Sequence, residues 1–398
     1  MAKETELLNV LSRAEAIEDF IVDIRRDIHK NPELSGHEFR TQARIIEELE
    51  KMGVEYKKAG LTSVVAFIKG NKPGKTIMLR GDIDALPILE QSGSDYSSVN
   101  EGSMHACGHD THSAMLLGAI KILNDMSDEL NGEVRFFFQE SEETFEGAQR
   151  IIADGFMKGV DMCFGMHNHP MVPTGKIIVK DGYLSAGCDT IFVKFEGVSG
   201  HGSTPHLAKD TIHPATVFVQ DLQGIVAKNV DSQEAIVVSV GKFVGGTKAN
   251  IIAKYTSLDI SMRYFNKETR KTVHEAIKRH AKAIADMYEI DVTVDIEESA
   301  LSIVNDVNAA ELIREATIEI MGEESLGRLK DYMGSDLLMG SEDFSYYLEE
   351  TPGAMVWIGS GDDVIKYPPH HEKFQVIEKF MNYGAALHAQ VALDFLNK

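Results

Sequence analysis

The stretch FFFQESEE occupies residues 136–143 and joins a continuous apolar run to three carboxylates. A run without polar alternation predicts a strand that is buried on both faces, as in a parallel or mixed sheet covered by helices. Similar runs alternate with helical stretches along the chain: SVVAFIKG (63–70), TIMLRGD (76–82) and MCFGMHNH (162–169). This βαβ rhythm predicts an α/β domain whose mixed sheet is covered by helices on both faces.

Helical spacing of apolar residues predicts helices over residues 5–30 and 37–52, before most of these strands. The turn residues of NPELSG (31–36) end the first helix. We also expect a helix directly after His112, another near 146–154, and a helix at the end of the chain.

The pattern changes near Ala186, where strands and helices follow one another in the order βαββαβ. This order is typical of a self-contained ferredoxin-like sheet with two helices on one face. We therefore expect three segments: 1–185 and 300–398 form one domain, which is interrupted by a smaller domain at 186–299.

The composition limits the class of protein. At 398 residues the chain exceeds what one hydrophobic core usually supports, and it contains no apolar run long enough to span a membrane. A net charge of −22 argues against nucleic-acid and membrane partners. Residues 1–15 do not resemble a secretory signal, and three cysteines are too few for a disulfide framework. We expect a cytoplasmic protein.

The densest group of reactive side chains is MHACGHDTH at residues 104–112. Cys107 and His109 are two residues apart, a spacing at which a turn can direct both side chains into one site. Thiolate and imidazole are a strong ligand pair for zinc-like metals. Two alternatives remain open: these are buried core histidines beside a buried cysteine, or Cys107 is a nucleophile with His109 as its base.

Further candidate ligands follow other strands. Glu140, Glu142 and Glu143 lie at the carboxyl end of the buried strand, where open α/β sheets bind their ligands, although a solvated acidic turn is the alternative. His167 and His169 end the next strand, and His370 and His371 follow two prolines. One thiol, several imidazoles and the two adjacent carboxylates of Glu142 and Glu143 are about what two divalent ions require for hydrolysis.

At these residues the sequence resembles the M20 metallopeptidase family, in particular the branch of hippurate hydrolases, aminoacylases and auxin-conjugate hydrolases. The resemblance spans nearly the whole chain and rests on an ordered set of motifs: HKNPELSG (29–36), LRGDIDALPI (79–88), MHACGHDTH (104–112), FQESEE (138–143), GMHNHP (165–170), GHGSTPH (200–206), MGSEDF (339–344) and PHHEKF (369–374).

The resemblance implies two divalent metal ions, zinc or manganese, with cobalt and nickel as further candidates. It implies five ligands: Cys107, His109, Glu143, His167 and His370. Cys107 would bridge both ions, and Glu142 would be the general base. His370 is preferred to His371 because the family's last ligand lies four residues before an aromatic residue, here Phe374. Asp82 and Asp84 would support the ligands from behind.

The inserted domain corresponds to the family's lid, which often dimerises. His201 in GHGSTPH matches a lid histidine that reaches the partner's active site in dimeric relatives and helps to hold the oxyanion. Asn250 and Arg263 match lid positions that contact substrate, although a turn asparagine and an exposed strand arginine are the alternatives. Whether His201 acts in its own subunit or in the partner's stays open.

Two positions depart from the family pattern. The family commonly has proline at the position of Glu140, and it has Asn-Val-Ile-Pro where this chain has Asn250, Ile251, Ile252 and Ala253. We expect Glu140 to add a negative charge near the metals and Ala253 to loosen a loop beside the pocket, so both affect substrate preference rather than the reaction.

The expected function is metal-dependent hydrolysis of N-acyl amino acids, of the N-acetyl or N-benzoyl type, to a carboxylate and a free amino acid. The partner is therefore a small molecule or short peptide, and a homodimer through the lid is expected. The alternatives are a carboxypeptidase or dipeptidase of the same family, and a non-catalytic metal-dependent binding protein. A phosphoesterase is disfavoured because the sequence lacks a concentrated cationic clamp.

Overall fold

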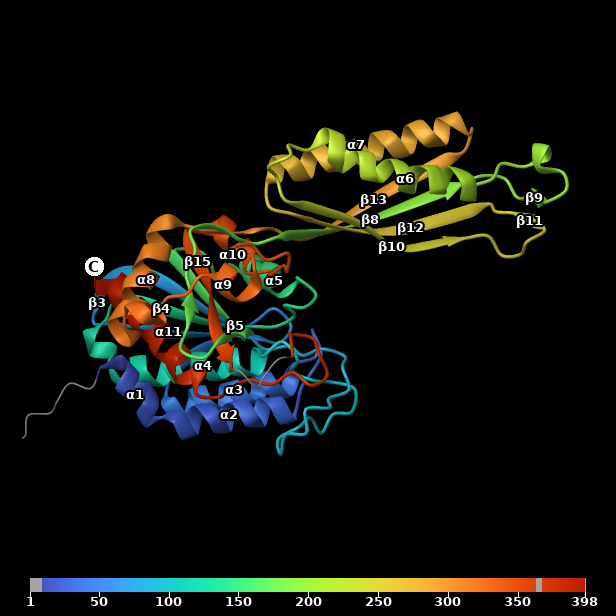
Figure 1. The fold of residues 1–398 in the computed structure, drawn as a ribbon. Helices are drawn as coiled ribbons and strands as arrows, with labels where there is room; N and C mark the ends of the chain where they lie inside the picture. Colours follow the sequence, from blue (N-terminus) through green and yellow to red (C-terminus); the bar gives the residue numbers. More distant parts are fainter. Residues whose placement is uncertain (1–8, 363–366, 398) are drawn as a thin grey trace, which may run out of the picture. The chain divides into compact units, whose positions relative to one another are not determined.

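The computed structural model describes residues 9–362 and 367–397, which divide into two compact units (Figure 1). The large unit contains the chain up to Leu184, Ile303–Leu338 and the chain from Glu342 onward. The inserted unit contains Ser185–Ser302 and the short segment Met339–Ser341. The sequence pattern predicts that the inserted domain spans residues 186–299, and it does not predict that Met339–Ser341 belongs to it.

Among the described residues, the large unit is built on a seven-stranded mixed sheet. Its strands, in spatial order, are β1 (Glu55–Ala59), β2 (Ser63–Lys69), β4 (Asn131–Gln139), β3 (Lys72–Asp82), β5 (Met162–Pro173), β15 (Gly353–Gly361) and β6 (Ile177–Ile178). The four strands β4, β3, β5 and β15 are mutually parallel, whereas the outer strands pair antiparallel.

Helices cover both faces of this sheet (Figure 1). One face carries α1 (Val10–Ala16), α2 (Glu18–Lys30), α3 (Phe39–Met52), α4 (His109–Asp125), α8 (Val307–Met321) and α11 (Phe380–Asn397). The other face carries α5 (Gly147–Ala153), α9 (Leu329–Met333) and α10 (Ser345–Glu350). Phe136 and Phe138 belong to the first core and Phe137 to the second, which explains the unbroken apolar run. The predicted α/β class is confirmed.

The crossover connections place several strand ends together. Helix α4 connects β3 to β4 and α5 connects β4 to β5, so that β4 and β5 flank β3 on opposite sides. The carboxyl ends of these parallel strands therefore meet at one edge, where open α/β sheets bind ligands. Gly81 lets α4 approach β3 closely, because a Cβ there would lie 2.9 Å from the carbonyl oxygen of His112.

The inserted unit is an antiparallel sheet with two helices on one face (Figure 1). Its strands, in spatial order, are β10 (Ile236–Gly245), β12 (Tyr255–Tyr264), β8 (Gly187–Glu196) and β13 (Asp291–Ala300). Its helices are α6 (Ile212–Asn229) and α7 (Lys267–Met287). This βαββαβ arrangement confirms the predicted ferredoxin-like insertion. A separate ribbon pairs β9 (Gly200–His201) with β11 (Ile251–Ile252).

The predicted first helix, residues 5–30, is wrong as a single element. Residues 5–8 lie outside the described part of the chain, and the remainder forms two helices that are separated at Ile17. The amide of Ile17 closes the last turn of α1 on the carbonyl of Ala14, and its φ of −113° is not helical. Apolar spacing continues across this break, so periodicity alone misses it.

The described residues also contain β7 (Gly182–Ser185), which pairs with β14 (Ile303–Asn305), and 3₁₀ turns at Ser127–Glu129, Pro205–Leu207 and Glu323–Ser325. Within residues 9–362 and 367–397, no helix combines the length and the apolar character needed to cross a bilayer.

Candidate functional site

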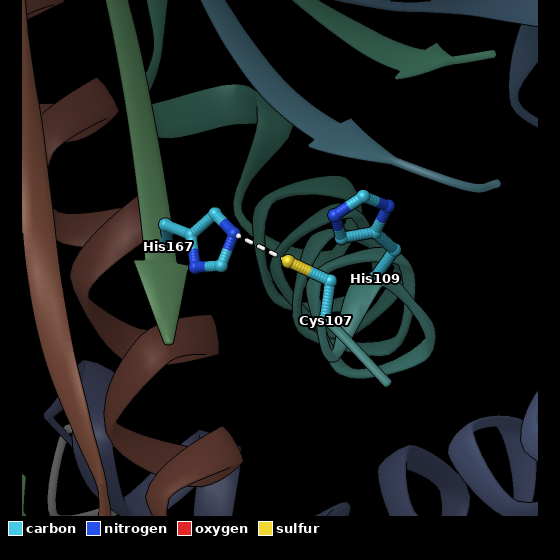
Figure 2. A group of neighbouring side chains, drawn as sticks. All are labelled: Cys107, His109 and His167. Atoms are coloured by element: carbon cyan, nitrogen blue, oxygen red, sulfur yellow. Dashed lines mark hydrogen bonds between the residues drawn. The ribbon is translucent and has the colours of Figure 1, made fainter. Parts of the chain in front are cut away.

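Three of the predicted ligands converge at the edge of the large sheet. Cys107, His109 and His167 direct their side chains toward one another (Figure 2), and their ligand atoms all lie within 4.8 Å of each other. The thiol sulfur of Cys107 is 3.4 Å from Nε2 of His167. All three residues are buried, with at most 8% of their surface exposed. This is a thiol–imidazole set of the kind that binds zinc-like ions.

The start of α4 positions two of these side chains. The helix begins at His109 rather than after His112, so His109 stands on the first turn and Cys107 just precedes it. Gly108 caps the helix with φ +88°, a conformation that side chains rarely adopt. A Cβ at Gly108 would also lie 2.3 Å from the side-chain oxygen of Asn168. Only glycine therefore fits between Cys107 and His109.

Cys107 also belongs to a second group, with Glu143 and His370. Nε2 of His370 lies 3.4 Å from Oε1 of Glu143. The backbone amide of His370 donates to the carbonyl of Ala106 at 2.8 Å, which ties the C-terminal loop to the cysteine loop. His370 has φ +68°, a strained conformation for a residue other than glycine. The five predicted ligands thus fall into two groups that share Cys107.

Hydrogen bonds fix which nitrogen of each buried histidine faces the group. Nδ1 of His167 donates to the carbonyl of Asn168 at 2.7 Å, which leaves Nε2 facing Cys107. Nδ1 of His109 lies 3.1 Å from Oδ1 of Asp84. Among the described residues, Nε2 of His109 and Oε1 of Glu143 are buried without a well-formed hydrogen bond, although Oε1 of Glu143 lies 3.4 Å from Nε2 of His370. Buried polar atoms are rarely left unsatisfied, so these two atoms fit metal ions.

The raised pKa values of Cys107 and His370 mean that metal binding at these residues must release protons. Burial, followed by the charge of Glu143, raises the pKa of the Cys107 thiol. Hydrogen bonds to Cys107 and then to Glu143 raise the pKa of His370 to about 10. Metal ions bind the thiolate and the neutral imidazole, so binding must release these protons and should strengthen as pH rises.

Glu142 lies beside the ligand groups. Its carboxylate belongs to a group with His109 and Glu143, and its Oε2 is 3.9 Å from Nε2 of His109. Burial, followed by the charges of Glu342 and Glu143, raises the pKa of Glu142 well above its usual range. A buried carboxyl group with a raised pKa is suited to accepting a proton and returning it near neutral pH.

Asp84 holds two of the candidate ligands at once. Its Oδ1 is 3.1 Å from Nδ1 of His109, and its Oδ2 accepts from the backbone amide of Glu143 at 3.1 Å and from Ser35 Oγ at 2.7 Å. Asp82 similarly lies 2.5 Å from Nδ1 of His112. Asp84 thus contacts two predicted ligands, whereas this contact of Asp82 is to His112, which is not among them. The supporting role of both aspartates stays a prediction.

Asp84→Asn is expected to weaken metal binding by about 10- to 100-fold, the usual cost of removing a residue that orients a ligand. The amide removes the negative charge opposite His109 and can no longer accept from both the histidine and Glu143. Competition with a fluorescent chelator measures this change. Ser35→Ala is the control, since it removes one hydrogen bond to Asp84 and leaves both ligand contacts. Equal affinity in Asp84→Asn and the wild type would contradict this role.

The inserted unit holds the remaining predicted residues. His201 pairs with Ile251 in the β9–β11 ribbon, and the amide of Gly202 donates to the carbonyl of Asn250 at 2.9 Å. Nδ1 of His201 accepts from the amide of Ser203 at 3.1 Å, so the neutral ring carries its proton on Nε2. His201 and Asn250 are therefore neighbours, and both are exposed.

Arg263 lies far from this ribbon within the inserted unit. It is near the end of β12, whereas the ribbon adjoins the start of that strand at Tyr255. The eight residue steps between Tyr255 and Arg263 span about 26 Å at the usual rise of a strand. Arg263 donates to the hydroxyl of Ser341 at 2.6 Å. Within one inserted unit, Arg263 therefore lies far from both His201 and Asn250.

Glu140 differs from the expectation that its charge acts near the metals. Its carboxylate accepts from the amide of Leu61 at 2.8 Å and the hydroxyl of Thr62 at 2.7 Å, and it forms an ion pair with Arg150 at 3.3 Å. Among the described residues it belongs to none of the candidate ligand groups. These contacts balance the charge of Glu140 locally. The chain turns at the next residue, Ser141, which has φ +53°.

Three other histidines of the motifs have contacts of their own. His371 stacks on Tyr367 with ring centroids 4.5 Å apart, and His112 contacts Asp82 and Asn168 through its two nitrogens. His169 packs edge-on against Trp357. The preference for His370 over His371 therefore agrees with their positions.

The sequence interpretation gave no role to a buried cluster behind Glu142, although two of its members lie in the MGSEDF motif. Arg80 forms ion pairs with Asp82, Glu342 and Asp343 at 2.7, 2.8 and 2.9 Å. Arg80 is 262 residues from Glu342 in sequence, so only the folded chain shows that they pair.

The family model of peptidase family M20/M25/M40 matches residues 78–394. The chain is 37% identical to thermostable carboxypeptidase 2 of Saccharolobus solfataricus, over 96% of this chain and 97% of that protein. It is 35% identical to an N-acetylcysteine deacetylase of Bacillus subtilis, over 94% of this chain and 97% of that protein.

A solved structure is similar over nearly its whole length. It is a dinuclear metal-binding peptidase of the M20 family from Bacillus subtilis, with a TM-score of 0.81 and 32% identity, covering 96% of this chain and 99% of that one. The chain therefore belongs to peptidase family M20/M25/M40. It is a metal-dependent hydrolase that acts on amide bonds.

Proposed function

We propose that this hydrolase is a two-metal amidohydrolase that cleaves N-acyl amino acids, of the N-acetyl or N-benzoyl type, to a carboxylate and a free amino acid. The observation that carries the proposal is that two ligand groups share Cys107 and lie beside a buried glutamate. The similarity to an N-acetylcysteine deacetylase supports the acyl amino acid as the substrate class.

The residues that would hold the two ions are Cys107, His109, Glu143, His167 and His370. Thiolate and imidazole favour zinc, and the carboxylate also suits manganese. When bound, such ions acidify water and polarise the amide carbonyl.

Glu142 supplies the proton transfers. Its buried carboxylate accepts a proton from the attacking water and then donates that proton to the nitrogen of the departing amine. His201 donates a hydrogen bond from Nε2 to the developing oxyanion, because Ser203 occupies its Nδ1. Asn250 assists from the same ribbon.

Arg263 binds the free carboxylate of the substrate. A guanidinium group is the usual partner for a carboxylate, and Ser341 already orients this one. A local cation is needed because the protein as a whole carries a net charge of −22. The expected partner is therefore an anionic small molecule or a short peptide. We expect the protein to act in the cytoplasm.

Arg263→Ala is expected to raise KM for an N-acyl amino acid by about 10- to 100-fold, the usual value of a hydrogen bond to a charged group. The change in kcat should be small, because the carboxylate is bound equally in the ground state and the transition state. Arg279→Ala removes the same charge from the exposed face of α7 and is the control. An unchanged KM in Arg263→Ala would contradict the assignment.

The separation of Arg263 from His201 supports a dimer. A small substrate is much shorter than the span of about 26 Å along β12. If both residues act on one substrate, His201 of the partner subunit must complete the site. Dimerisation through the inserted unit is therefore part of the proposal.

A mixing experiment tests this arrangement. Glu142→Gln and His201→Ala are each expected to be nearly inactive alone. After exchange of subunits, a mixed dimer contains one site with an intact Glu142 and an intact His201 from the partner, so an equal mixture should regain about a quarter of wild-type activity. Sedimentation velocity should give about twice the 44.0 kDa chain mass. A mixture that stays inactive although mixed dimers form would show that His201 acts in its own subunit.

A carboxypeptidase is the second candidate, because the chain is 37% identical to a protein of that name. The two functions share their chemistry and differ in the group on the amino side of the cleaved bond. Rates with N-acetyl and N-benzoyl amino acids should be compared with those of dipeptides that have the same C-terminal residue. Higher kcat/KM for the acyl amino acids supports the proposal, and higher kcat/KM for the dipeptides contradicts it.

A further inference from the structure

A pair of buried acidic residues, Glu342 and Asp343, lies directly behind Glu142. Carboxylate oxygens of the three residues are within 4.8 Å of one another. The exposed fractions are 5% for Glu142, 3% for Glu342 and 0% for Asp343. Like charges are rarely packed so closely in a buried site without a reason.

Both acidic residues behind Glu142 are fixed in place. Glu342 Oε1 accepts from Arg80 Nη2 at 2.8 Å and from the amide of Phe344 at 3.2 Å. Asp343 accepts from Arg80 at 2.9 Å and from Gln139 at 2.7 and 2.8 Å. Arg80 is itself fully buried and held by Asp82 at 2.7 Å. These contacts hold Glu342 and Asp343 in place beside Glu142.

Glu142 is held less firmly than the pair. Among the described residues, its ion-pair partner is His109, at 3.9 Å. Arg80 interacts electrostatically with Glu142 and is a competing partner for it. Burial lowers the pKa of Arg80, but four surrounding carboxylates raise it well above its ordinary value: Asp82, Glu342, Asp343 and Glu142. A free guanidinium at this position would draw Glu142 away from the ligand groups.

We propose that Glu342 is a positioning residue for the general base. Its carboxylate occupies Arg80 and repels the carboxylate of Glu142, so that Glu142 faces His109 and Glu143 rather than Arg80. This inference rests on the proposed function, because it requires Glu142 to be the base. It assigns a task to the MGSEDF motif, which places a charged residue behind the base.

Two variants of Glu342 separate charge from shape. Glu342→Gln keeps the length of the side chain and an oxygen for Arg80 and Phe344, but removes the repulsion. Glu342→Asp keeps the charge and shortens the side chain. We expect kcat to fall about 10- to 100-fold in Glu342→Gln, with KM and metal content unchanged, and to fall less in Glu342→Asp. Glu48→Gln is the control, because Glu48 is also a buried glutamate paired with an arginine, Arg44, but is distant in sequence from Glu342. It should leave kcat unchanged.

A double-mutant cycle adds a readout that a purely structural role would not change. In a Glu142→Asp background with measurable activity, Glu342→Gln should cost much less than in the wild type, since both residues act through the same carboxylate. Wild-type kcat in Glu342→Gln, a lower kcat in Glu342→Asp than in Glu342→Gln, or an equal loss in both backgrounds would overturn the inference. The proposed function fails separately, if the wild type hydrolyses no acyl amino acid or if Glu142→Gln stays active.

Discussion

Glu142→Gln is expected to lower kcat by about 10²- to 10⁴-fold, the range that general acid–base catalysis contributes. The amide has nearly the shape of the carboxylate but cannot take the proton of the attacking water. Because Glu142 is the proposed base and not a proposed ligand, the variant should bind as much metal as the wild type. KM should change little, since the contact between Arg263 and the substrate carboxylate remains.

Steady-state kinetics with an N-acetyl amino acid, together with metal analysis of the same preparation, measures this effect. Glu140→Gln is the matched control, because Glu140 is equally buried and two residues away, but pairs with Arg150. Its kcat should stay within about threefold of the wild type, as expected for a residue outside the reacting groups. Near-wild-type kcat in Glu142→Gln, or equal losses of kcat in Glu142→Gln and Glu140→Gln, would contradict the assignment of Glu142 as the general base.

Cys107→Ser is expected to have the second large effect, a loss of both ions and of at least about a hundredfold in activity. Removing residues that merely orient ligands costs about 10- to 100-fold, so removing a shared ligand should cost more. Both groups that the five predicted ligands form contain Cys107, and a serine hydroxyl at this position is a much poorer ligand than a thiolate for zinc-like ions.

Metal content per chain, measured by mass spectrometry after gel filtration, tests the shared position. Cys163→Ser is the control, since Cys163 is also buried and free but faces the carbonyl of Thr351 at 3.9 Å. We expect close to two ions per chain in the wild type and the control, and fewer than one in Cys107→Ser. A loss of only one ion in Cys107→Ser would mean that the cysteine does not bridge.

The sequence predicts the parts of this protein that depend on local pattern. The unbroken run at 136–138 indicates a strand between two cores, and Phe136 and Phe137 do face opposite sides. Ligand-type residues at strand ends are predicted to meet because parallel strands end at one edge of the sheet. The proximity of the five residues is visible in the structure, while their role as ligands stays a prediction.

The rest depends on contacts that no local pattern contains. Arg80 pairs with Glu342 across 262 positions, and Glu140 is balanced by the amide of Leu61 and by Arg150. Neither pairing has a periodicity or a motif of its own. The two-residue strands of the ribbon that carries His201 are too short for alternation to be detected. The break at Ile17 is hidden because apolar spacing continues through it.

The most direct test is hydrolysis of an N-acetyl amino acid by the protein as prepared, after removal of metal with a chelator, and after addition of zinc or manganese. Two-metal catalysis predicts release of acetate and the free amino acid, loss of activity on chelation, and recovery as the metal content approaches two ions per chain. Undiminished turnover in a protein shown to be free of metal, or no turnover of any acyl amino acid with two ions bound, would contradict it.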